Sequence, residues 1–286
     1  MAKKKIVVID EDFEELKREW YSIPTIKYEM VKTMLHRETA TINVIDGRRT
    51  LRCLKIGAVK YLDMNDERYD ILSEPFNIYS SLAKYPMMPV FSFSRDVKKN
   101  QQNKFNDEYR DYMSEYDFLI DVDNENVGQA LKSVRKVKGI FDEMNVPYWL
   151  MFSGSKGFHI RVEFKDFPDW LKKKEWDDIS DFLKKFAENL RAVTGIDDID
   201  LSVFDLRRIA KTPYSVVYPY YFIALPLSDE QLDNFNFEMV SLPILLRENL
   251  DNPTKFYNRG LLKREGSPEG FENLIKEYMG SEFQDG

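Results

Sequence analysis

Residues 117–164 read DFLIDVDNENVGQALKSVRKVKGIFDEMNVPYWLMFSGSKGFHIRVEF and decide the fold of this 286-residue chain. Phe118 to Val122 is a short β-type run, and Asn126 to Met144 has the apolar spacing of a long amphipathic helix. Two more β-type runs follow, Pro147 to Phe152 and Phe158 to Phe164. The stretch therefore predicts a strand, a helix and two further strands in that order.

The same alternation continues downstream. Lys174 to Thr194 is predicted to form a helix that Gly195 ends, and strands are predicted near Ile199 to Phe204 and Val216 to Ala224. The order β-α-β-β-α-β is the split βαβ arrangement of a ferredoxin-like or RRM-like sheet. We therefore expect an α+β fold with an RRM-like catalytic sheet. Polymerase palms often use such a sheet, but the fold alone does not give a function.

Upstream of residue 117 the pattern indicates a separate α/β unit. Asp12 to Tyr21 and Lys27 to Leu35 are predicted helices, and Ala40 to Ile45 and Thr50 to Ile56 are predicted strands around the Asp46-Gly47 turn. We expect three segments. They are the N-terminal α/β unit at residues 1–116, the RRM-like catalytic unit at 117–240, and a C-terminal extension at 241–286.

The composition argues against some classes of nucleic-acid-binding protein and excludes some kinds of metal site. A formal charge of −7 argues mildly against a protein that coats nucleic acid. Cys53 is the only cysteine and His36 and His159 are the only histidines, which excludes an internal disulfide and a zinc site built from several Cys or His ligands. We expect no zinc, and any bound metal ion must be held by oxygen atoms.

The sequence also indicates where the protein works. Its longest apolar stretches, such as Val146 to Phe152, are far too short to span a bilayer, and residues 1–12 lack the pattern of a signal peptide. We therefore expect a cytoplasmic protein without a membrane partner.

Three motifs carry candidate chemistry, and the first is Asp121-Val122-Asp123. Residues two apart in a strand project from the same face, and two neighbouring carboxylates repel unless a cation lies between them. Mg²⁺ or Mn²⁺ prefers such ligands, and two ions about 3.5–4 Å apart can clamp the attacking and leaving oxygens of phosphoryl transfer. The alternative is structural, with Asp123 opening a turn with Asn124 and Asp121 a satisfied edge residue.

The second motif is the segment from Ser153 to His159, SGSKGFH, between two predicted strands. Its two glycines allow backbone amides to face an anion, and Ser155, Lys156 and His159 add a hydroxyl, a cation and an imidazole. The alternative is a polar turn with a buried, hydrogen-bonded histidine. The phosphate loop of the Walker A type does not occur in the sequence.

The third motif is an acid inside an apolar run, Ile199-Asp200-Leu201, followed by a set of cations. The trailing residues are Arg207, Arg208, Lys211, Pro213, Tyr214 and Ser215. Such a set suits a metal ligand with cations that hold a triphosphate and a developing pyrophosphate. Alternatively, Asp197, Asp198 and Asp200 form a solvated acidic loop.

In this order, the three motifs resemble those of the archaeo-eukaryotic primase superfamily, with its primase-polymerase fold. The resemblance implies that Asp121, Asp123 and Asp200 are catalytic residues and bind Mg²⁺ or Mn²⁺. It also implies nucleotide contacts for a second set, which comprises Ser153, Ser155, Lys156, His159, Arg208 and Lys211.

The resemblance extends upstream and covers roughly Lys27 to Leu225. Arg37-Glu38 and the downstream Arg52 look like a segment that lies at the active site of primase small subunits, so Glu38 and Arg52 are possible second nucleotide or template contacts. The run Ile78-Tyr79-Ser80-Ser81 with Tyr85 resembles the stretch before their first motif.

Departures from the family pattern leave two points open. Many relatives carry a zinc knuckle that this chain cannot build, and several have Ser-x-His where this chain has Ser215-Val216-Val217. Asp205 competes with Asp200 as the third acid. We favour Asp200 for its apolar flanks and its distance from Pro213.

The resemblance implies a template-dependent nucleotidyltransferase, a DNA primase or primase-polymerase, that joins NTPs or dNTPs on single-stranded DNA. A primase large subunit or another replication protein is a possible partner. One alternative is a gap-filling repair polymerase that extends primers without starting them. Another is a non-catalytic RRM-like nucleic-acid-binding module, which would need exposed aromatic residues on its central strands.

Overall fold

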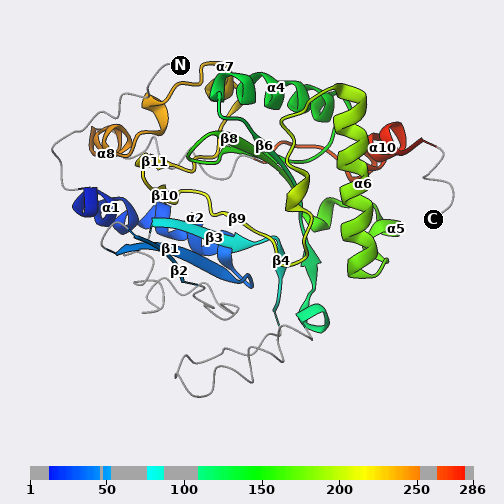
Figure 1. Cartoon of the computed structure of the whole chain (residues 1–286), viewed down its shortest axis with the longest axis horizontal. Coiled ribbons are helices and arrows are strands. Elements are labelled where there is room, and N and C mark those ends of the chain that lie inside the picture. Colours follow the sequence, from blue (N-terminus) through cyan, green and yellow to red (C-terminus); the bar gives the residue numbers. More distant parts are fainter. Residues whose placement is uncertain (1–12, 46–47, 53–75, 87–108, 252–262, 281–286) are drawn as a thin grey trace.

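A computed structural model gives the arrangement of the chain and describes residues 13–45, 48–52, 76–86, 109–251 and 263–280 (Figure 1). The helices are α1 (Phe13–Ser22), α2 (Pro24–Met34), α4 (Val127–Glu143), α5 (Asp169–Lys172), α6 (Trp176–Thr194), α7 (Asp229–Asp233), α8 (Leu242–Asp251) and α10 (Pro268–Met279). Short 3-10 helices are η2 (Tyr109–Tyr112), η3 (Phe164–Asp166), η4 (Leu201–Val203) and η5 (Glu238–Val240).

Strands β6 (Phe118–Asp123), β7 (Trp149–Phe152) and β8 (Gly157–Val162) form a three-stranded sheet. We call it the catalytic sheet after the role expected from the sequence. The strands are antiparallel in the order β6-β8-β7, so the third strand in sequence lies in the middle. That order, with α4 connecting β6 to β7, is the one the split βαβ arrangement requires. The predicted strand, helix and two strands of residues 117–164 are therefore confirmed.

Local sequence explains where the two long helices begin and end. The side chain of Asn126 accepts a hydrogen bond from the Gly128 N–H and caps α4, which buries one face that includes Val134 and Phe141. Helix α6 ends at Gly195, whose φ of 65° lies in the left-handed region that glycine adopts without strain. Both helices pack beside the catalytic sheet (Figure 1).

The predicted strand from Ile199 to Phe204 is wrong. The segment touches β6 through one antiparallel bridge, between Val122 and Ile199, and the Asp200 N–H donates to the Asp121 carbonyl at 2.8 Å. The Asp200 side chain then accepts from the Ser202 N–H and caps η4. A capping aspartate starts a helical turn where the apolar pattern favoured a strand. The bridge still occupies the edge of β6 where a fourth strand of a split βαβ sheet lies.

The predicted strand from Val216 to Ala224 is also wrong as a single element. It is a hairpin of β10 (Val216–Val217) and β11 (Phe222–Ile223), and the turn between them contains the cis peptide Tyr218–Pro219. Proline has no N–H to donate to a sheet, so it interrupts the run. Beyond the hairpin, the Leu225 N–H donates to the Phe152 carbonyl at 3.1 Å and the chain lines the free edge of β7.

A second, four-stranded sheet lies beside the catalytic one (Figure 1). Its strands are β1 (Thr39–Ile45), β2 (Arg48–Arg52), β3 (Phe76–Ser81) and β9 (Ile209–Lys211), in the order β2-β1-β3-β9. The register pairs Ile45 with Arg48, as a hairpin requires, while the Asp46-Gly47 turn itself lies outside the described residues. A two-stranded ladder of β4 (Ala83–Lys84) and β5 (Glu115–Tyr116) follows β3.

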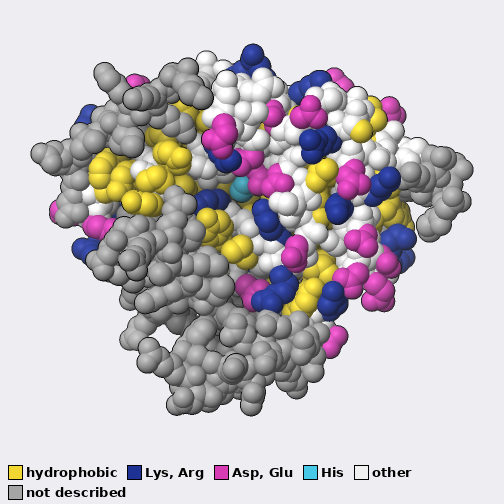
Figure 2. Space-filling model, in the orientation of Figure 1, with side chains coloured by type: hydrophobic (Ala, Val, Ile, Leu, Met, Phe, Trp, Pro, Cys, Tyr) yellow, Lys and Arg dark blue, Asp and Glu magenta, His cyan; other side chains and the backbone are white. Residues whose placement is uncertain are grey.

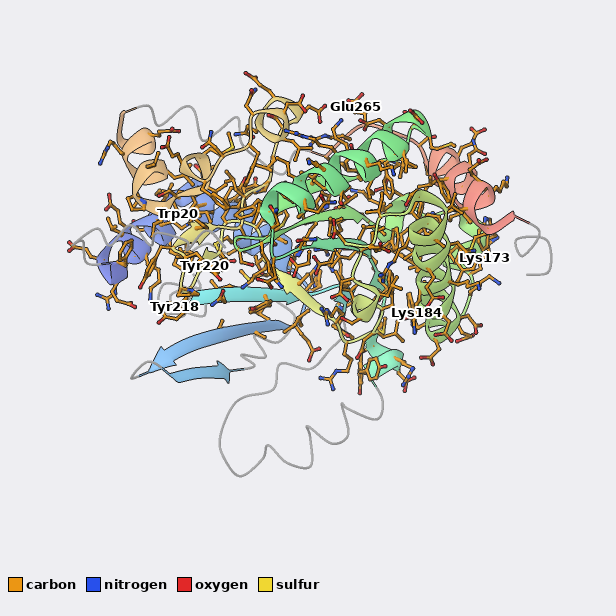
Figure 3. The ribbon with its side chains drawn as sticks, turned by 45° about the horizontal axis from the view of Figure 1, so that its top comes forward. Trp20, Lys173, Lys184, Tyr218, Tyr220 and Glu265 are labelled. Carbon is orange, nitrogen blue, oxygen red and sulfur yellow. The ribbon has the colours of Figure 1, made fainter. Side chains whose placement is uncertain are left out.

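Strand β9 comes from the segment that follows α6, yet it completes the sheet of the N-terminal part. The division at residues 116 and 240 stays a prediction. Helix α1 meets the same downstream segment, because the Trp20 indole N–H donates to the Tyr214 carbonyl at 2.8 Å. Figure 3 places Trp20, Tyr218 and Tyr220 on one side of the molecule, away from Lys173 and Lys184.

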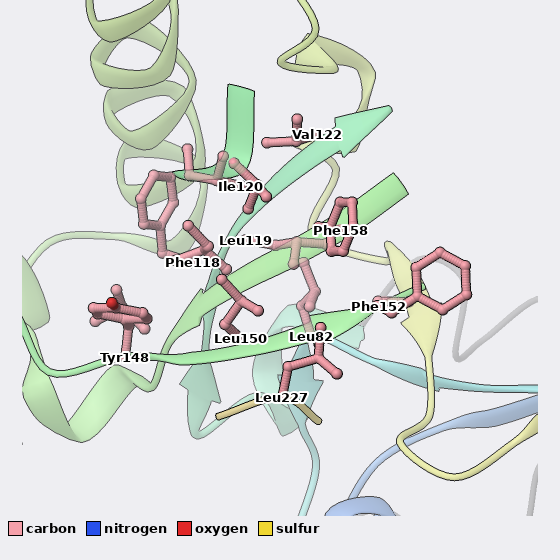
Figure 4. Close-up of a cluster of buried hydrophobic side chains, with 14 of the residues drawn as sticks. Leu82, Phe118, Leu119, Ile120, Val122, Tyr148, Leu150, Phe152, Phe158 and Leu227 are labelled. Atoms are coloured by element: carbon pink, nitrogen blue, oxygen red, sulfur yellow. The ribbon is translucent and has the colours of Figure 1, made fainter. Parts of the chain in front are cut away.

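A large hydrophobic core holds the catalytic sheet (Figure 4). Phe118, Ile120 and Val122 of β6 are fully buried, as is Phe158 of β8. The C-terminal helix α10 adds Phe271, whose ring stacks against Phe118 with centroids 5.8 Å apart. No helix among the described residues combines the length and the apolar character that a membrane span needs.

Candidate active site

A pocket of about 150 Å³ opens between the two sheets. One wall comes from the catalytic sheet and its loop and carries Asp121, Asp123, Ser153, Ser155 and His159. The other wall comes from β3, β9 and the residue before β9, and it carries Tyr79, Arg208 and Lys211. Figure 2 shows acidic and basic side chains gathered around a histidine on one face of the molecule. The three predicted motifs therefore meet at one pocket with acids on one side and cations on the other.

Asp121 and His159 face each other across neighbouring strands. They are paired in the β6–β8 register, and His159 Nε2 lies 3.6 Å from Asp121 Oδ1. Burial lowers the pKa of His159 to about 3, and the charges of Lys211, Arg161 and Arg208 act in the same direction. The imidazole is therefore neutral near pH 7, so the contact is not an ion pair.

The Asp121 carboxyl is in an unfavourable position for an anion. Its Oδ1 atom is buried without a hydrogen-bond partner. Burial, together with the neighbouring charges of Asp123 and Asp200, raises the pKa of Asp121 to about 7. A carboxylate with an unpaired oxygen beside two like charges gains most from a cation.

Asp123 lies beside the loop that joins β7 to β8. Lys156 Nζ is 3.3 Å from Asp123 Oδ2 and 2.9 Å from Glu125 Oε1. Gly157 is opposite Asp123 in the register, and a Cβ there would lie 2.2 Å from Asp123 Oδ1. The glycine is thus needed for close approach, and Lys156 turns toward Asp123 and Glu125 and does not line the pocket.

Asp200 is close to the pair but points partly elsewhere. Its two carboxylate oxygens accept from the Ser202 N–H and hydroxyl at 2.8 and 2.9 Å, and Arg208 Nη2 lies 3.9 Å away. It does not line the pocket, although its charge acts on Asp121. Asp205, the competing acid, is exposed and accepts from the Arg207 N–H. The choice of Asp200 stays a prediction, supported by its electrostatic effect on Asp121.

Lys211 is aimed by residues that the motifs did not assign. Its ammonium donates to Asn77 Oδ1 at 2.5 Å and to the Tyr79 hydroxyl at 2.9 Å, and Tyr79 is its cross-strand partner on β3. Nothing in the sequence pointed to Asn77, because only the pairing of β3 with β9 brings it close. Tyr79 lay in the run that resembles primases, but the resemblance gave it no role.

The structure does not place the upstream residues of the resemblance in this pocket, so their role as second nucleotide or template contacts stays a prediction. Arg37 is buried and its guanidinium binds Asp117, outside the pocket. Glu38 Oε1 accepts from Arg207 Nη2 at 3.4 Å and does not line the pocket either. Arg52 lies in β2, and its side chain is outside the described residues.

The donor atoms fit a hard divalent cation in part. Asp121 and Asp123 supply carboxylate oxygens, one of them unpaired, and such oxygens suit Mg²⁺ or Mn²⁺. Over the part of the chain that the structure describes, no three His, Cys, Asp or Glu side chains are already arranged as a cation site. Asp200 would have to turn from Ser202, and Lys156 from Asp123, for all three acids to reach one ion.

Replacing Asp121 by asparagine is expected to stabilise the metal-free protein more at pH 8 than at pH 5. The pKa of Asp121 is raised to about 7 from 3.8. The carboxyl therefore favours the folded state while it holds its proton, and that contribution is lost as the pH rises through about 7. Urea unfolding of both proteins in EDTA at the two pH values measures the difference. An equal difference at both would mean that Asp121 titrates as it does in the unfolded chain.

Comparison with known proteins bears on the fold. No protein-family model matches the chain. The polymerase domain of Mycobacterium tuberculosis ligase D, solved in complex with DNA, superimposes with a TM-score of 0.55 over 84% of this chain and 88% of that domain, at 12% identity. The chain has the fold of that polymerase domain.

Two other comparisons are weaker. The catalytic domain of primase RepB′, in complex with initiator DNA, has a TM-score of 0.37 at 10% identity, over 83% of this chain and 98% of that one. An uncharacterized protein of Methanocaldococcus jannaschii is 30% identical over 112 residues, which is 36% of this chain. The match spans a quarter of that protein's length.

Proposed function

We propose that the chain is a template-dependent nucleotidyltransferase of the DNA primase or primase-polymerase type, which joins NTPs or dNTPs on single-stranded DNA by a two-metal mechanism. The observation that carries the proposal is the pocket, with Asp121 and Asp123 on one wall and Arg208 and Lys211 on the other. Acids on one side and cations on the other suit a triphosphate bound with divalent ions.

Asp121, Asp123 and Asp200 are the residues that would hold Mg²⁺ or Mn²⁺, which would stabilise the charge on the attacking and leaving oxygens. In the reaction, the primer 3′ hydroxyl loses its proton to solvent and its oxygen forms a bond to the α-phosphorus. The bond from that phosphorus to the pyrophosphate oxygen breaks, and pyrophosphate leaves. Arg208 and Lys211 face the pocket and can offset the charge that develops on the pyrophosphate.

The loop between β7 and β8 provides neutral and cationic contacts for the same phosphates. The Ser153 and Ser155 hydroxyls and the neutral His159 imidazole line the pocket and can donate hydrogen bonds to phosphate oxygens. Lys156 can add a cation once it leaves Asp123 and Glu125. The loop binds groups that are present before the reaction, so it should act on nucleotide affinity.

Replacing Lys156 or His159 by alanine is therefore expected to raise the apparent KM for nucleotide about tenfold or more, because each change removes a charged or buried hydrogen bond worth about 1.5–3 kcal/mol. Steady-state extension kinetics and equilibrium binding of ATP or GTP measure the effect. The control is Lys165→Ala, which removes a lysine of similar kind that pairs with Glu163 outside the pocket. Unchanged nucleotide binding in both test variants would favour the alternative interpretation, in which the loop is a polar turn that does not bind nucleotide.

The non-catalytic alternative is disfavoured by the central strands. An RRM-like binding module needs aromatic rings exposed on its sheet. Phe118 of β6 and Phe158 of β8 are fully buried, and the open face of β6 presents Asp121 and Asp123. Carboxylates there would repel a phosphate backbone in the absence of cations.

An extension assay tests the proposal and separates its two enzymatic forms. The purified chain is incubated with a single-stranded template, labelled nucleotides and Mn²⁺, with and without an annealed primer, and NTPs and dNTPs are compared. Products without primer indicate priming, and products with primer alone indicate a gap-filling polymerase. No incorporation under either condition, with nucleotide binding absent as well, would reject the proposal.

A further inference from the structure

A buried ion cluster lies next to the pocket and is not part of it. Asp117 Oδ2 accepts hydrogen bonds from Arg37 Nη2 at 2.6 Å and from Arg161 Nε at 2.9 Å, and Arg161 Nη2 contacts the same oxygen. The second oxygen, Oδ1, accepts from the Phe164 N–H at 2.9 Å. All three charged side chains are at most 5% exposed. Both carboxylate oxygens are therefore satisfied in a water-excluded site.

The three residues come from segments that carry the walls of the pocket. Asp117 immediately precedes β6, which bears Asp121, and Arg161 lies on β8 two residues after His159. Arg37 comes from the other side, just before β1. The cluster thus joins the catalytic sheet to the four-stranded sheet.

Backbone contacts extend the junction to β3. Arg37 Nη1 donates to the carbonyls of Ser81 and Leu82, at 2.9 and 2.6 Å, at the end of β3. The Asp117 N–H donates to the same Leu82 carbonyl at 3.1 Å. Strand β3 carries Tyr79, which aims Lys211 at the pocket. One buried carboxylate is therefore linked to both walls.

The charges in the cluster are maintained near neutral pH. Burial alone would raise the pKa of Asp117, but Arg37 and Arg161 hold it well below its usual range. Burial lowers the pKa of Arg37 to about 10, so the guanidinium stays protonated. Burying charges is costly, and apolar residues of similar volume often stabilise a fold as well or better. Such a cluster is better explained by the geometry that it imposes than by stability alone.

We propose that Asp117 is a positioning residue for the nucleotide pocket, holding Arg161 and Arg37 so that the wall with Asp121 and His159 stays at a fixed distance from the wall with Lys211. The inference rests on the proposed function for its catalytic consequence. Misplacement of reacting groups by about 1 Å can cost about 100-fold in rate, even when the mutation is remote from the chemistry.

The test compares Asp117→Asn with Leu274→Ala. Leu274 is fully buried on α10 and does not line the pocket, so its truncation lowers stability by loss of apolar packing. Urea unfolding first defines conditions in which both variants are fully folded. Under those conditions, kcat/KM for primer extension is expected to fall about 10–100-fold in Asp117→Asn and to change little in Leu274→Ala.

A second readout does not depend on activity. The chain has two histidines, so its imidazole NMR spectrum contains two spin systems, and a His36→Asn variant assigns them. In Asp117→Asn, the release of Arg161 should shift the His159 resonances. In Leu274→Ala, where Asp117 still binds Arg161, these resonances should not move. If the wild-type chain incorporates no nucleotide, the proposed function fails, while the histidine spectrum still decides the positioning role.

If Asp117→Asn does not fold, Arg161→Lys replaces it in both measurements, because lysine keeps the charge but loses the second hydrogen bond to Asp117. Asp117→Glu, which keeps the carboxylate, should recover part of the activity. Equal kcat/KM in the folded cluster variant and in Leu274→Ala, with unshifted His159 resonances, would overturn the inference and leave the cluster a purely stabilising role.

Discussion

Replacement of Asp121 or Asp123 by alanine is expected to abolish nucleotide incorporation. Each change removes a carboxylate from the pocket wall where divalent ions would bind, and ions of this kind contribute several kcal/mol of transition-state stabilisation. A loss of that size corresponds to about a thousandfold or more in rate. Single-turnover primer extension with saturating Mn²⁺ measures the loss.

The same variants should remain folded. In the metal-free protein Asp121 is buried beside two like charges, so its removal relieves repulsion, and the melting temperature is expected to stay level or rise. Asp123→Ala loses an ion pair with Lys156 that is more than one-third exposed on both sides, and such pairs contribute about 0–1 kcal/mol. A folded Asp121→Ala protein with near wild-type extension would reject the metal assignment.

Asp200→Asn and Asp205→Asn form a matched pair for the third acid. Both acids accept a backbone N–H two residues later, from Ser202 and Arg207 respectively, and asparagine keeps that cap. We expect a large loss of extension for Asp200→Asn and little change for Asp205→Asn, because Asp200, unlike Asp205, is among the main charges that raise the pKa of Asp121. The reverse result would make Asp205 the third acid and leave the two-metal mechanism in place.

The sequence was most informative where periodicity and caps agree. Residues 117–164 alternate between a β-type run with two acids, a helix with an Asn cap, and two apolar strands, and the structure has these elements in the predicted order. The same reasoning failed for Ile199 to Phe204. An apolar run around one acid is compatible with both a strand and a capped 3-10 turn. The hydrogen bond from the Ser202 N–H to the Asp200 side chain competes with strand pairing, and the apolar pattern does not show which of the two forms.

The motifs predicted the pocket wall that carries Asp121 and His159, but not the wall that carries Lys211. Asp121 and His159 belong to neighbouring strands of one predicted sheet, so their approach follows from the fold. The place of Lys211 depends on the pairing of β9 with β3, which are more than 120 residues apart in the sequence. No local pattern reports a pairing over that separation, and the contacts of Lys211 with Asn77 and Tyr79 could not be predicted for the same reason.

Gly157→Ala is expected to reduce both stability and activity. A Cβ at this position would lie 2.2 Å from Asp123 Oδ1 and 2.4 Å from the Val122 carbonyl oxygen. Because the carbonyl is backbone, β6 and β8 would have to separate, and overpacking of this kind costs about 1–3 kcal/mol. The shift would displace Asp123 at the pocket, so extension should fall further than the loss of stability explains.

Gly139→Ala is the matched control, since the same methyl group is added where nothing lies within 4 Å. Gly139 lies inside α4, and alanine there should stabilise the helix by about 1 kcal/mol without changing extension. Urea unfolding and primer extension are measured for both variants. The comparison distinguishes the general effect of an added methyl group from the effect of adding it at the contact between β6 and β8. If Gly157→Ala kept wild-type stability and extension rate, β6 and β8 could accommodate the methyl group without displacing Asp123. The close contact at Gly157 would then not be required for the position of Asp123 in the pocket.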